Sequence, residues 1–427
     1  MARRWSASST RWRASRRCQT GCSPSKPAAS GGPALPGRPP DCWRASSVGR
    51  EVRAINDARV VTPDGILEGA SIVLEDGRIS GITARAERSG EAIDAAGRYV
   101  LPGMVDLHCD AIEKQLAPRP GVEVPEELAF MEMDRLFAGC GVTTGFHGVS
   151  IMAGRSRGVE RGRRLCALVS RLAGEGLVRH ELHLRCELPQ EESVRAVEEV
   201  LGRGFARLVS VMDHTPGQGQ FRDLEWFRRY WSGDGADEAQ ISAALAEAER
   251  SEYTIALDRV GRIASAAKKH GATLASHDDD TVERVEVLAG HGVDISEFPV
   301  NAASARRARE LGHAVCMGAP NALRGVSSGG NLSALEAVEA GLVDALVSDY
   351  HPPSMLQAAF KLAREDVLPL PESVALVTGG PARAAGLSDR GGIARGAKAD
   401  LIIVGGRAGI PTVTHTIVNG ESRHAAG

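Results

Sequence analysis

The 427-residue sequence has few aromatic side chains and lacks any long apolar run. Phe, Trp and Tyr make up only 4% of the chain, whereas glycine occurs 49 times, a balance typical of a loop-rich fold. No run of about 18 apolar residues occurs, so the pattern gives no membrane-spanning helix. The length predicts one large α/β unit with a smaller satellite unit.

A disulfide pattern is also lacking. Eight cysteines occur without a repeated spacing, which argues against a disulfide framework and favours a reducing, cytoplasmic location. Cys18 and Cys22 are spaced like half of a zinc finger, but no second His/Cys pair follows at the required distance.

Most of the chain lacks a basic surface. Residues 1–50 carry nine arginines and one lysine against the single Asp41, a net charge of +9, and the remaining residues carry −12. An acidic body argues against a nucleic-acid partner, because phosphate-backbone binding needs a basic stripe. Local positive charges would therefore have to meet any anionic ligand.

The basic head, residues 1–50, has neither a helical nor a strand period, and its Arg, Ser, Pro and Gly content predicts disorder. One alternative is a transit peptide or twin-arginine signal, which the lack of a following apolar segment disfavours. The other is an upstream start codon that adds residues not made in the cell.

Short alternating runs at both ends of the remaining chain predict a small β-domain. Residues 51–101 contain two such runs, punctuated by the turn signals PDG at 63–65 and EDG at 75–77, which indicate β-hairpins. Residues 390–427 repeat the style in KADLIIVGG and THTIVNGES. We expect the two ends to form one composite β-sandwich domain and residues 102–389 to form a separate domain.

That central region alternates short apolar runs with amphipathic stretches, the pattern of parallel βαβ units. The eight candidate strands lie at 104–110, 141–149, 182–189, 207–217, 273–280, 294–301, 314–321 and 345–352. Eight such units predict an α/β fold of the closed (β/α)8 TIM-like barrel type. In such a barrel the carboxyl ends of the strands carry the chemistry.

Most candidate strands end in residues that can bind metals or transfer protons. They are His108, Asp110, His147, Glu187, Asp213, His214, His277, Asp278, Asp279, Glu297, Asp349 and His351. Buried without partners, such groups would each cost several kcal/mol, and a shared divalent cation offsets that cost. Imidazole together with carboxylate suits Zn, Mn or Fe better than Ca. His108 and Asp110 are the sharpest pair, because the i, i+2 spacing points both from one strand into the barrel mouth.

Plainer interpretations stay open for several of these residues. His147 and His351 are each isolated at a strand end and are more typical of core or loop histidines. His183 shares a face with Arg185 and Glu187 but lies deeper in its strand, which favours packing. The acidic run 278–280 could be a solvated helix N-terminus.

Two features indicate a phosphorylated substrate. The Gly/Ser segment Arg324–Asn331, which includes Ser327 and Ser328, follows the seventh strand and leads into a helix, an arrangement that can present backbone N–H groups to an anion. Lys114 and Arg119 follow the first strand and add positive charge beside the predicted metal.

Several motifs resemble the amidohydrolase superfamily and, within it, the diphosphatases of the carbon–phosphorus lyase pathway. They are LPGMVDLH at 101–108, GVTT at 141–144, LHLRCELP at 182–189, SVMDHTPGQ at 210–218, SHDD at 276–279, MGAPN at 317–321, SDY at 348–350 and GAKADL at 396–401. The resemblance covers roughly residues 52–420. It implies the hydrolysis of a ribose 1-methylphosphonate 5-triphosphate to its 5-phosphate and pyrophosphate.

The resemblance also marks ligands for one or two divalent metals, with Zn favoured and Mn or Fe as alternatives. They are His108, Asp110, Glu187 as a bridging carboxylate, His214, His277 and Asp349. The first strand carries His-x-Asp, whereas the superfamily opening is His-x-His. The superfamily also places its two later histidines one strand further on, which predicts that the strand count above misses one strand.

The predicted mechanism uses Asp349 to orient the attacking water and to accept its proton. The predicted phosphate contacts are Lys114, Arg119, Arg185, Arg324, Ser327 and Ser328. The rival enzyme is an amide or cyclic-imide hydrolase, or a deaminase, on the same barrel. An inactive scaffold that acts through oligomerisation is a third hypothesis. A small phosphorylated sugar is the expected partner, and a homo-oligomer is left open.

Overall fold

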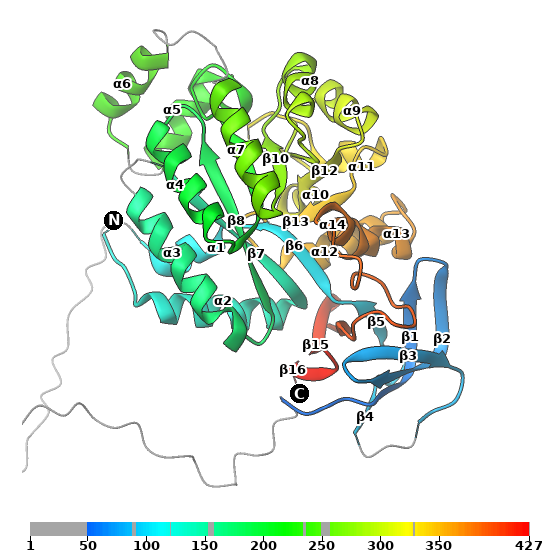
Figure 1. Cartoon of the computed structure of the whole chain (residues 1–427). Coiled ribbons are helices and arrows are strands. Elements are labelled where there is room, and N and C mark those ends of the chain that lie inside the picture. Colours follow the sequence, from blue (N-terminus) through cyan, green and yellow to red (C-terminus); the bar gives the residue numbers. More distant parts are fainter. Residues whose placement is uncertain are drawn as a thin grey trace, which may run out of the picture. The chain divides into compact units, whose positions relative to one another are not determined.

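The computed structural model describes residues 49–87, 91–119, 121–152, 158–233, 236–248, 257–327 and 329–426. The head, predicted to be disordered, lies outside the described residues apart from Gly49 and Arg50. Two sheets organise the described chain, one closed and surrounded by helices and the other formed from the two chain ends (Figure 1).

The closed sheet is a parallel barrel with strands in chain order. Its strands are β6 Met104–Cys109, β7 Val142–Ile151, β8 Arg179–Glu187, β9 Ala206–Met212, β10 Thr273–His277, β11 Ile295–Glu297, β12 Ala314–Gly318 and β13 Ala345–Val347. A parallel bridge between Cys109 and Asp349 joins the last strand to the first. The predicted (β/α)8 barrel is therefore confirmed. The prediction of a missed strand is wrong, because the eight candidates already close the barrel.

Helices cover the outside of this barrel. They are α1 Ala111–Leu116, α2 Glu126–Cys140, α3 Val159–Leu172, α4 Glu191–Gly202, α7 Leu257–His270, α8 Val282–Gly290, α9 Ala302–Glu310, α10 Ala319–Arg324, α11 Ala334–Glu339, α12 Ser354–Arg364, α13 Leu370–Ala375 and α14 Gly379–Ala384. All ten residues of β7 are buried, as expected for a strand with packed side chains on both faces. Gly145 of β7 allows close packing, because a Cβ there would lie 2.5 Å from the ring of Phe137 in α2.

Side-chain caps fix the helices that follow the site strands. The hydroxyl of Thr281 accepts from the backbone amide of Arg284 at the start of α8, and the side chain of Asn301 accepts from Ser304 at the start of α9. Such caps contribute about 1 kcal/mol each. They hold the short turns that follow β10 and β11.

The second sheet joins both chain ends, as predicted. It contains β1 Ala54–Thr62, β2 Gly65–Glu75, β3 Arg78–Thr83, β4 Ala92–Asp94, β5 Tyr99–Pro102, β14 Leu401–Arg407, β15 Ile410–Val418 and β16 Glu421–Ala425. The order is β16-β15-β14-β5-β1-β2-β3, with β4 on β1, so the blue and red ends of the chain lie side by side in Figure 1. The exact domain limits at 101/102 and 389/390 stay predictions.

An excursion between β9 and α7 is rich in aromatic side chains compared with the rest of the chain. It comprises a short 3₁₀ turn at Gly219–Phe221, α5 Leu224–Gly233 and α6 Glu238–Ala248. Phe221, Phe227 and Ile241 form its own small core. Trp226 of α5 lies against Gly329, where a Cβ would stand 2.9 Å from the indole nitrogen. The excursion thus reaches from the end of β9 to the segment that follows α10.

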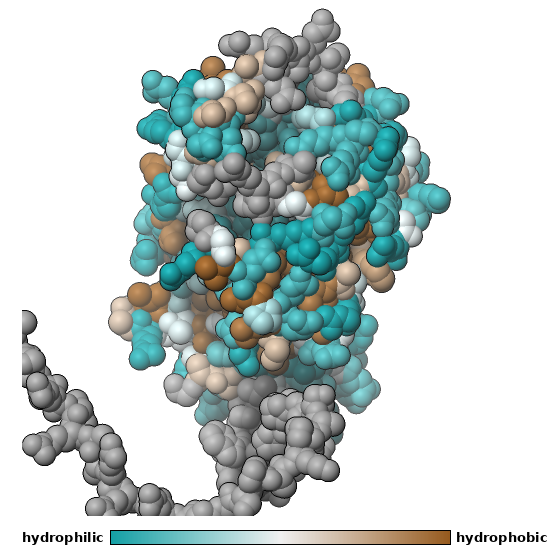
Figure 2. All heavy atoms as spheres, turned by 90° about the vertical axis from the view of Figure 1, so that its left-hand side faces the viewer, coloured by the Kyte–Doolittle hydropathy of each residue, from teal (hydrophilic) through white to brown (hydrophobic). Residues whose placement is uncertain are grey.

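The face of the molecule on the left of Figure 1 is mainly hydrophilic, with apolar side chains interspersed (Figure 2). Leu128 and Met131 of α2 are 45% and 48% exposed. Within the described residues no helix is long and apolar enough to cross a membrane. A homo-oligomer remains a prediction.

Candidate metal centre and active site

Three of the predicted histidines meet at the carboxyl ends of the barrel strands. His108 is the second-last residue of β6, His277 is the last residue of β10, and His214 follows the end of β9 by two residues. The ring centroid of His108 lies 5.6 Å from that of His277, which lies 5.7 Å from that of His214. The fold therefore brings together side chains that are up to 169 positions apart in sequence.

Two groups of side chains at this place are close enough to hold a divalent metal ion. One contains His108, His277 and Glu297, and the other contains His214, His277 and Asp278, with the ligand atoms of each group within 4.8 Å of one another. Three of the six predicted metal ligands, His108, His214 and His277, belong to these groups. The two carboxylates in the groups, Glu297 and Asp278, were not among the predicted ligands. Imidazole and carboxylate donors in one buried place fit a transition-metal ion.

His108 is suited to metal binding by its protonation state. Burial, reinforced by the nearby charges of Arg185 and His277, holds the pKa of His108 well below its ordinary value. The imidazole is therefore neutral near pH 7, as a metal ligand must be.

Glu187 lies against His214. Its carboxylate accepts hydrogen bonds from the backbone amide of His214 at 2.8 Å and from the ring Nδ1 at 2.7 Å. Burial raises the pKa of Glu187, but the charge and hydrogen bonds of His214 outweigh burial and lower it overall. The reverse balance raises the pKa of His214. Glu187 thus fixes the ring of His214 with Nε2 turned away from it.

Two of the three carboxylates of the acidic run after β10 are buried, so the interpretation of this run as a solvated helix N-terminus is wrong. Asp278 is 7% exposed and Asp279 is 0% exposed. The Asp278 carboxylate lies 2.9 Å from Nδ1 of His277. Burial raises the pKa of Asp278, but the charge and hydrogen bond of His277 and the charges of His214 and Arg185 together lower it. Asp279 instead accepts hydrogen bonds from the hydroxyls of Ser276 and Ser296, which tie β10 to β11 behind the site.

Asp349 and Asp110 form the opposite side of the cluster. The backbone amide of Asp110 donates to the carbonyl of Asp349 at 2.8 Å, and Arg185 donates to the Asp110 carboxylate at 3.2 Å. Burial, with Asp110 adding to it, raises the pKa of Asp349 to about 8 despite the opposing charges of Arg185 and Lys114. A neighbouring cation would therefore be needed to keep Asp349 ionised at neutral pH.

Three residues that follow barrel strands adopt left-handed backbone conformations. Asp278, Phe298 and Asp349 have φ of 55°, 53° and 55°. Each amide donates to a carbonyl of the next strand around the barrel, for example Asp278 to Glu297 at 2.9 Å. Such conformations cost about 1–2 kcal/mol each for residues other than glycine, and strain of this kind concentrates at functional sites.

The positive side chains predicted to bind phosphate are only partly gathered. Arg185 is buried beside Asp110, and Lys114 is exposed, with its Nζ 4.8 Å from the centroid of the Tyr350 ring. Arg119 lies in an exposed turn with Val122. Arg324 ends α10, and Ser327 follows it in the segment before α11. Ser328 lies outside the described residues, so its role stays a prediction, as do those of Arg119, Arg324 and Ser327.

Other histidines have structural surroundings. His147 is buried behind the barrel wall, where its Nε2 lies 2.8 Å from Nδ1 of His180, which in turn contacts Asp134 at 2.9 Å. Its interpretation as a core histidine is confirmed, and His351 lies on an exposed loop. His183 packs inside the barrel as predicted, but its ring also lies 4.8 Å from that of His108.

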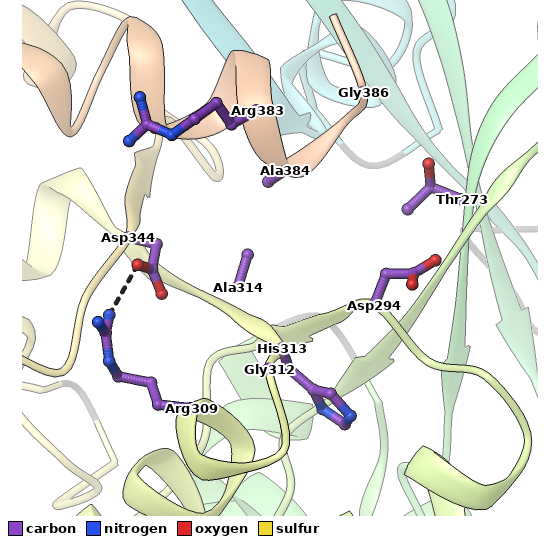
Figure 3. A pocket seen from close by; sticks show the side chains of 11 residues that line it. Thr273, Asp294, Arg309, Gly312, His313, Ala314, Asp344, Arg383, Ala384 and Gly386 are labelled. Carbon is purple, nitrogen blue, oxygen red and sulfur yellow. Dashed lines mark hydrogen bonds and ion pairs between the residues drawn. The ribbon is translucent and has the colours of Figure 1, made fainter.

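A pocket of about 580 Å³ opens at the other end of the barrel (Figure 3). It is lined by the amino ends of β10 and β12 and by residues that precede β11 and β13, including Asp294 and Asp344. Figure 3 shows Arg309 paired with Asp344, at 2.7 Å. The pocket contains none of the clustered ligands, so it is separate from the candidate active site.

Comparisons with known proteins agree with this architecture. A sequence model described as the amidohydrolase family matches residues 208–424. The chain is 36% identical to the α-D-ribose 1-methylphosphonate 5-triphosphate diphosphatase of Escherichia coli strain K12, over 82% of this chain and 94% of that protein. It is 26% identical to imidazolonepropionase of Mycolicibacterium smegmatis, over 84% and 92% of the two chains. The crystal structure of dihydropyrimidinase from Brevibacillus agri superposes with a TM-score of 0.59 at 14% identity, over 87% and 95%.

Proposed function

Because the chain belongs to the amidohydrolase family, we propose that it is a metal-dependent diphosphatase. The proposed reaction converts α-D-ribose 1-methylphosphonate 5-triphosphate and water to the corresponding 5-phosphate and pyrophosphate, as a step of phosphonate catabolism in the cytoplasm. The observation that carries this proposal is the 36% identity to the Escherichia coli diphosphatase along 82% of the chain. The positive side chains of Arg185 and Lys114 beside the acidic cluster support a polyphosphate substrate.

The proposed metal ligands are the six residues predicted from sequence: His108, Asp110, Glu187, His214, His277 and Asp349. The buried grouping of His108, His277 and His214 with carboxylates supports a divalent ion here, with Zn favoured over Mn and Fe. Once bound, the ion supplies a Lewis acid that makes water nucleophilic at neutral pH. We propose that the site holds one or two ions, which metal analysis of the purified protein will count.

The side chains have distinct proposed tasks. Asp349 orients the attacking water and takes its proton as the oxygen–phosphorus bond forms and the phosphoric anhydride bond breaks. Arg185 and Lys114 offset the negative charge that moves onto the departing pyrophosphate. Arg119, Arg324, Ser327 and Ser328 are proposed to hold the remaining phosphate oxygens.

A second candidate is hydrolysis of an amide or cyclic imide, or deamination. The similarity to imidazolonepropionase along 84% of the chain supports it. Lys114, whose charge acts on Asp349, would have no phosphate to bind in this reaction, because the cyclic substrate is neutral.

One substrate panel separates these candidates. Purified protein loaded with zinc is incubated with ribose 1-methylphosphonate 5-triphosphate, with a simple nucleoside triphosphate, and with a cyclic imide, and the release of pyrophosphate or acid is followed. We expect pyrophosphate from the first compound. Release from neither triphosphate would sink the diphosphatase assignment, and a protein that binds no metal would favour an inactive scaffold.

A further inference from the structure

A buried series of hydrogen-bonded side chains lies beside the proposed metal ligands. His183, Ser210 and Glu297 are each 0% exposed. Nδ1 of His183 donates to the carbonyl of Leu107 at 3.0 Å, and its Nε2 lies 2.5 Å from the hydroxyl of Ser210. That hydroxyl lies 2.6 Å from Oε2 of Glu297, and Oε1 of Glu297 lies 3.1 Å from Nδ1 of His108. The series thus ends on the first proposed metal ligand.

Each oxygen of the Glu297 carboxyl group has a protein partner. Ser210 contacts one oxygen and His108 contacts the other. Phe298, the next residue, packs edge-on against the rings of both His108 and His277, at 5.1 and 5.2 Å. Because both oxygens of Glu297 already have partners, its role is to accept a hydrogen bond from His108 and not to bind the metal.

This contact decides which nitrogen of His108 faces a metal. If Nδ1 carries the hydrogen that Glu297 accepts, Nε2 keeps its lone pair. In metal sites such a carboxylate–histidine contact fixes the ring and its tautomer, and losing it commonly weakens metal binding 10- to 100-fold.

We propose that Glu297 is a positioning residue that holds His108 with Nδ1 protonated and Nε2 turned to the metal, and that Ser210 and His183 hold Glu297 in turn. This inference rests on the proposed metal site. It assigns a task to three buried polar residues that are not among the six proposed ligands. Sequence spacing predicted only packing for His183.

A count of hydrogens gives a sharp test. Four contacts link Leu107 to His108 through His183, Ser210 and Glu297, and each needs one hydrogen. Neutral His183, the Ser210 hydroxyl and Nδ1-protonated His108 supply only three. The fourth must sit on Glu297 or on His183. A glutamine at position 297 supplies it from its amide, because the amide can donate to Ser210 while its oxygen accepts from His108.

The experiment compares Glu297→Gln, Glu297→Ala and Ser210→Ala with the unaltered chain, all purified in full length and titrated with zinc against a competing chelator. We expect Glu297→Gln to keep zinc affinity within about tenfold, and Glu297→Ala to lose 10- to 100-fold. Ser210→Ala should fall between them. A loss of more than about 100-fold in Glu297→Gln would overturn the inference, because it would make Glu297 a ligand.

Ser296→Ala is the matched control. Ser296 is as buried as Ser210 and lies on β11, the strand of Glu297. Its hydroxyl contacts Asp279 on the other side of the sheet. Its zinc affinity should equal that of the unaltered chain. An equal loss in Ser296→Ala and Ser210→Ala would mean that general loosening of the sheet causes both, and would also overturn the inference.

A second measurement does not depend on the metal. The ¹⁵N shifts of the His108 ring, assigned with His108→Gln, report the tautomer in the metal-free protein. Nδ1–H is expected in the unaltered chain and in Glu297→Gln, and a mixture is expected in Glu297→Ala. An Nε2–H tautomer in the unaltered chain refutes the inference. If the unaltered chain shows Nδ1–H but binds no zinc, only the proposed function fails.

Discussion

The backbone amide of Asp349 donates a hydrogen bond to the carbonyl oxygen of His108 over 2.8 Å. The amide of Asp110 returns a bond of the same length to the carbonyl of Asp349. The seam where the last strand meets the first is therefore also where Asp349, the proposed proton acceptor, meets the first proposed metal ligand. Closing the barrel and assembling this side of the site are one structural event.

Replacing Asp349 with Asn should lower kcat by about 10²- to 10⁴-fold, the usual contribution of a proton-transfer group. Metal content should largely persist, because five proposed ligands remain. The matched control is Asp366→Asn, since Asp366 has a similar φ of 54° on an exposed turn. Full activity in Asp349→Asn would refute the assignment, and zinc analysis of the same samples checks the ligand set.

The contribution of Asp349 to the stability of the metal-free protein should fall as the pH rises. Burial raises the pKa of Asp349 to about 8 from an ordinary value of 3.8. The folded state therefore binds this proton more tightly than the unfolded chain, so the stabilisation is complete below about pH 4 and disappears as the pH passes about 8. Urea denaturation of metal-free samples should show a smaller fall across this range for Asp349→Asn. Parallel pH profiles for the two proteins would contradict the shift.

Arg185→Lys should weaken binding of inorganic pyrophosphate, used as a competitive inhibitor, by about tenfold. Lysine keeps the charge but loses the planar pair of donors that suits phosphate and carboxylate groups. Arg185→Met should in addition destabilise the fold by about 3–5 kcal/mol, because it removes a buried positive charge that lies 3.2 Å from the Asp110 carboxylate. Unchanged inhibition in Arg185→Lys would remove Arg185 from the phosphate site.

Two glycines near α2 should respond oppositely to alanine. Gly145→Ala should cost about 1–3 kcal/mol, because its Cβ would press into the Phe137 ring at 2.5 Å. Gly139→Ala lies within α2 with no atom within 4 Å of its Cβ, and should stabilise by about 0.5–1 kcal/mol. Denaturant unfolding of both variants measures the difference. Equal effects would contradict the packing of α2 on β7.

The sequence by itself determined the order of elements and the kind of chemistry. Strand-like runs alternating with amphipathic stretches are a local signal, so all eight barrel strands and the hairpins at both ends could be found from the printed chain. His108, His214 and His277 were also found, because parallel strands place their carboxyl ends at one rim. These inferences need only the period of side chains and the direction of the strands.

Only the tertiary structure decided the partners of each group. The series His183–Ser210–Glu297–His108 joins four strands, and no local pattern specifies which hydroxyl meets which carboxylate. The buried position of Asp279 likewise depends on a contact with Ser296 of the next strand, which the sequence pattern of the run 278–280 does not specify. Ligand type follows from residue chemistry, whereas the tautomer, charge and position of each ligand depend on contacts between distant segments.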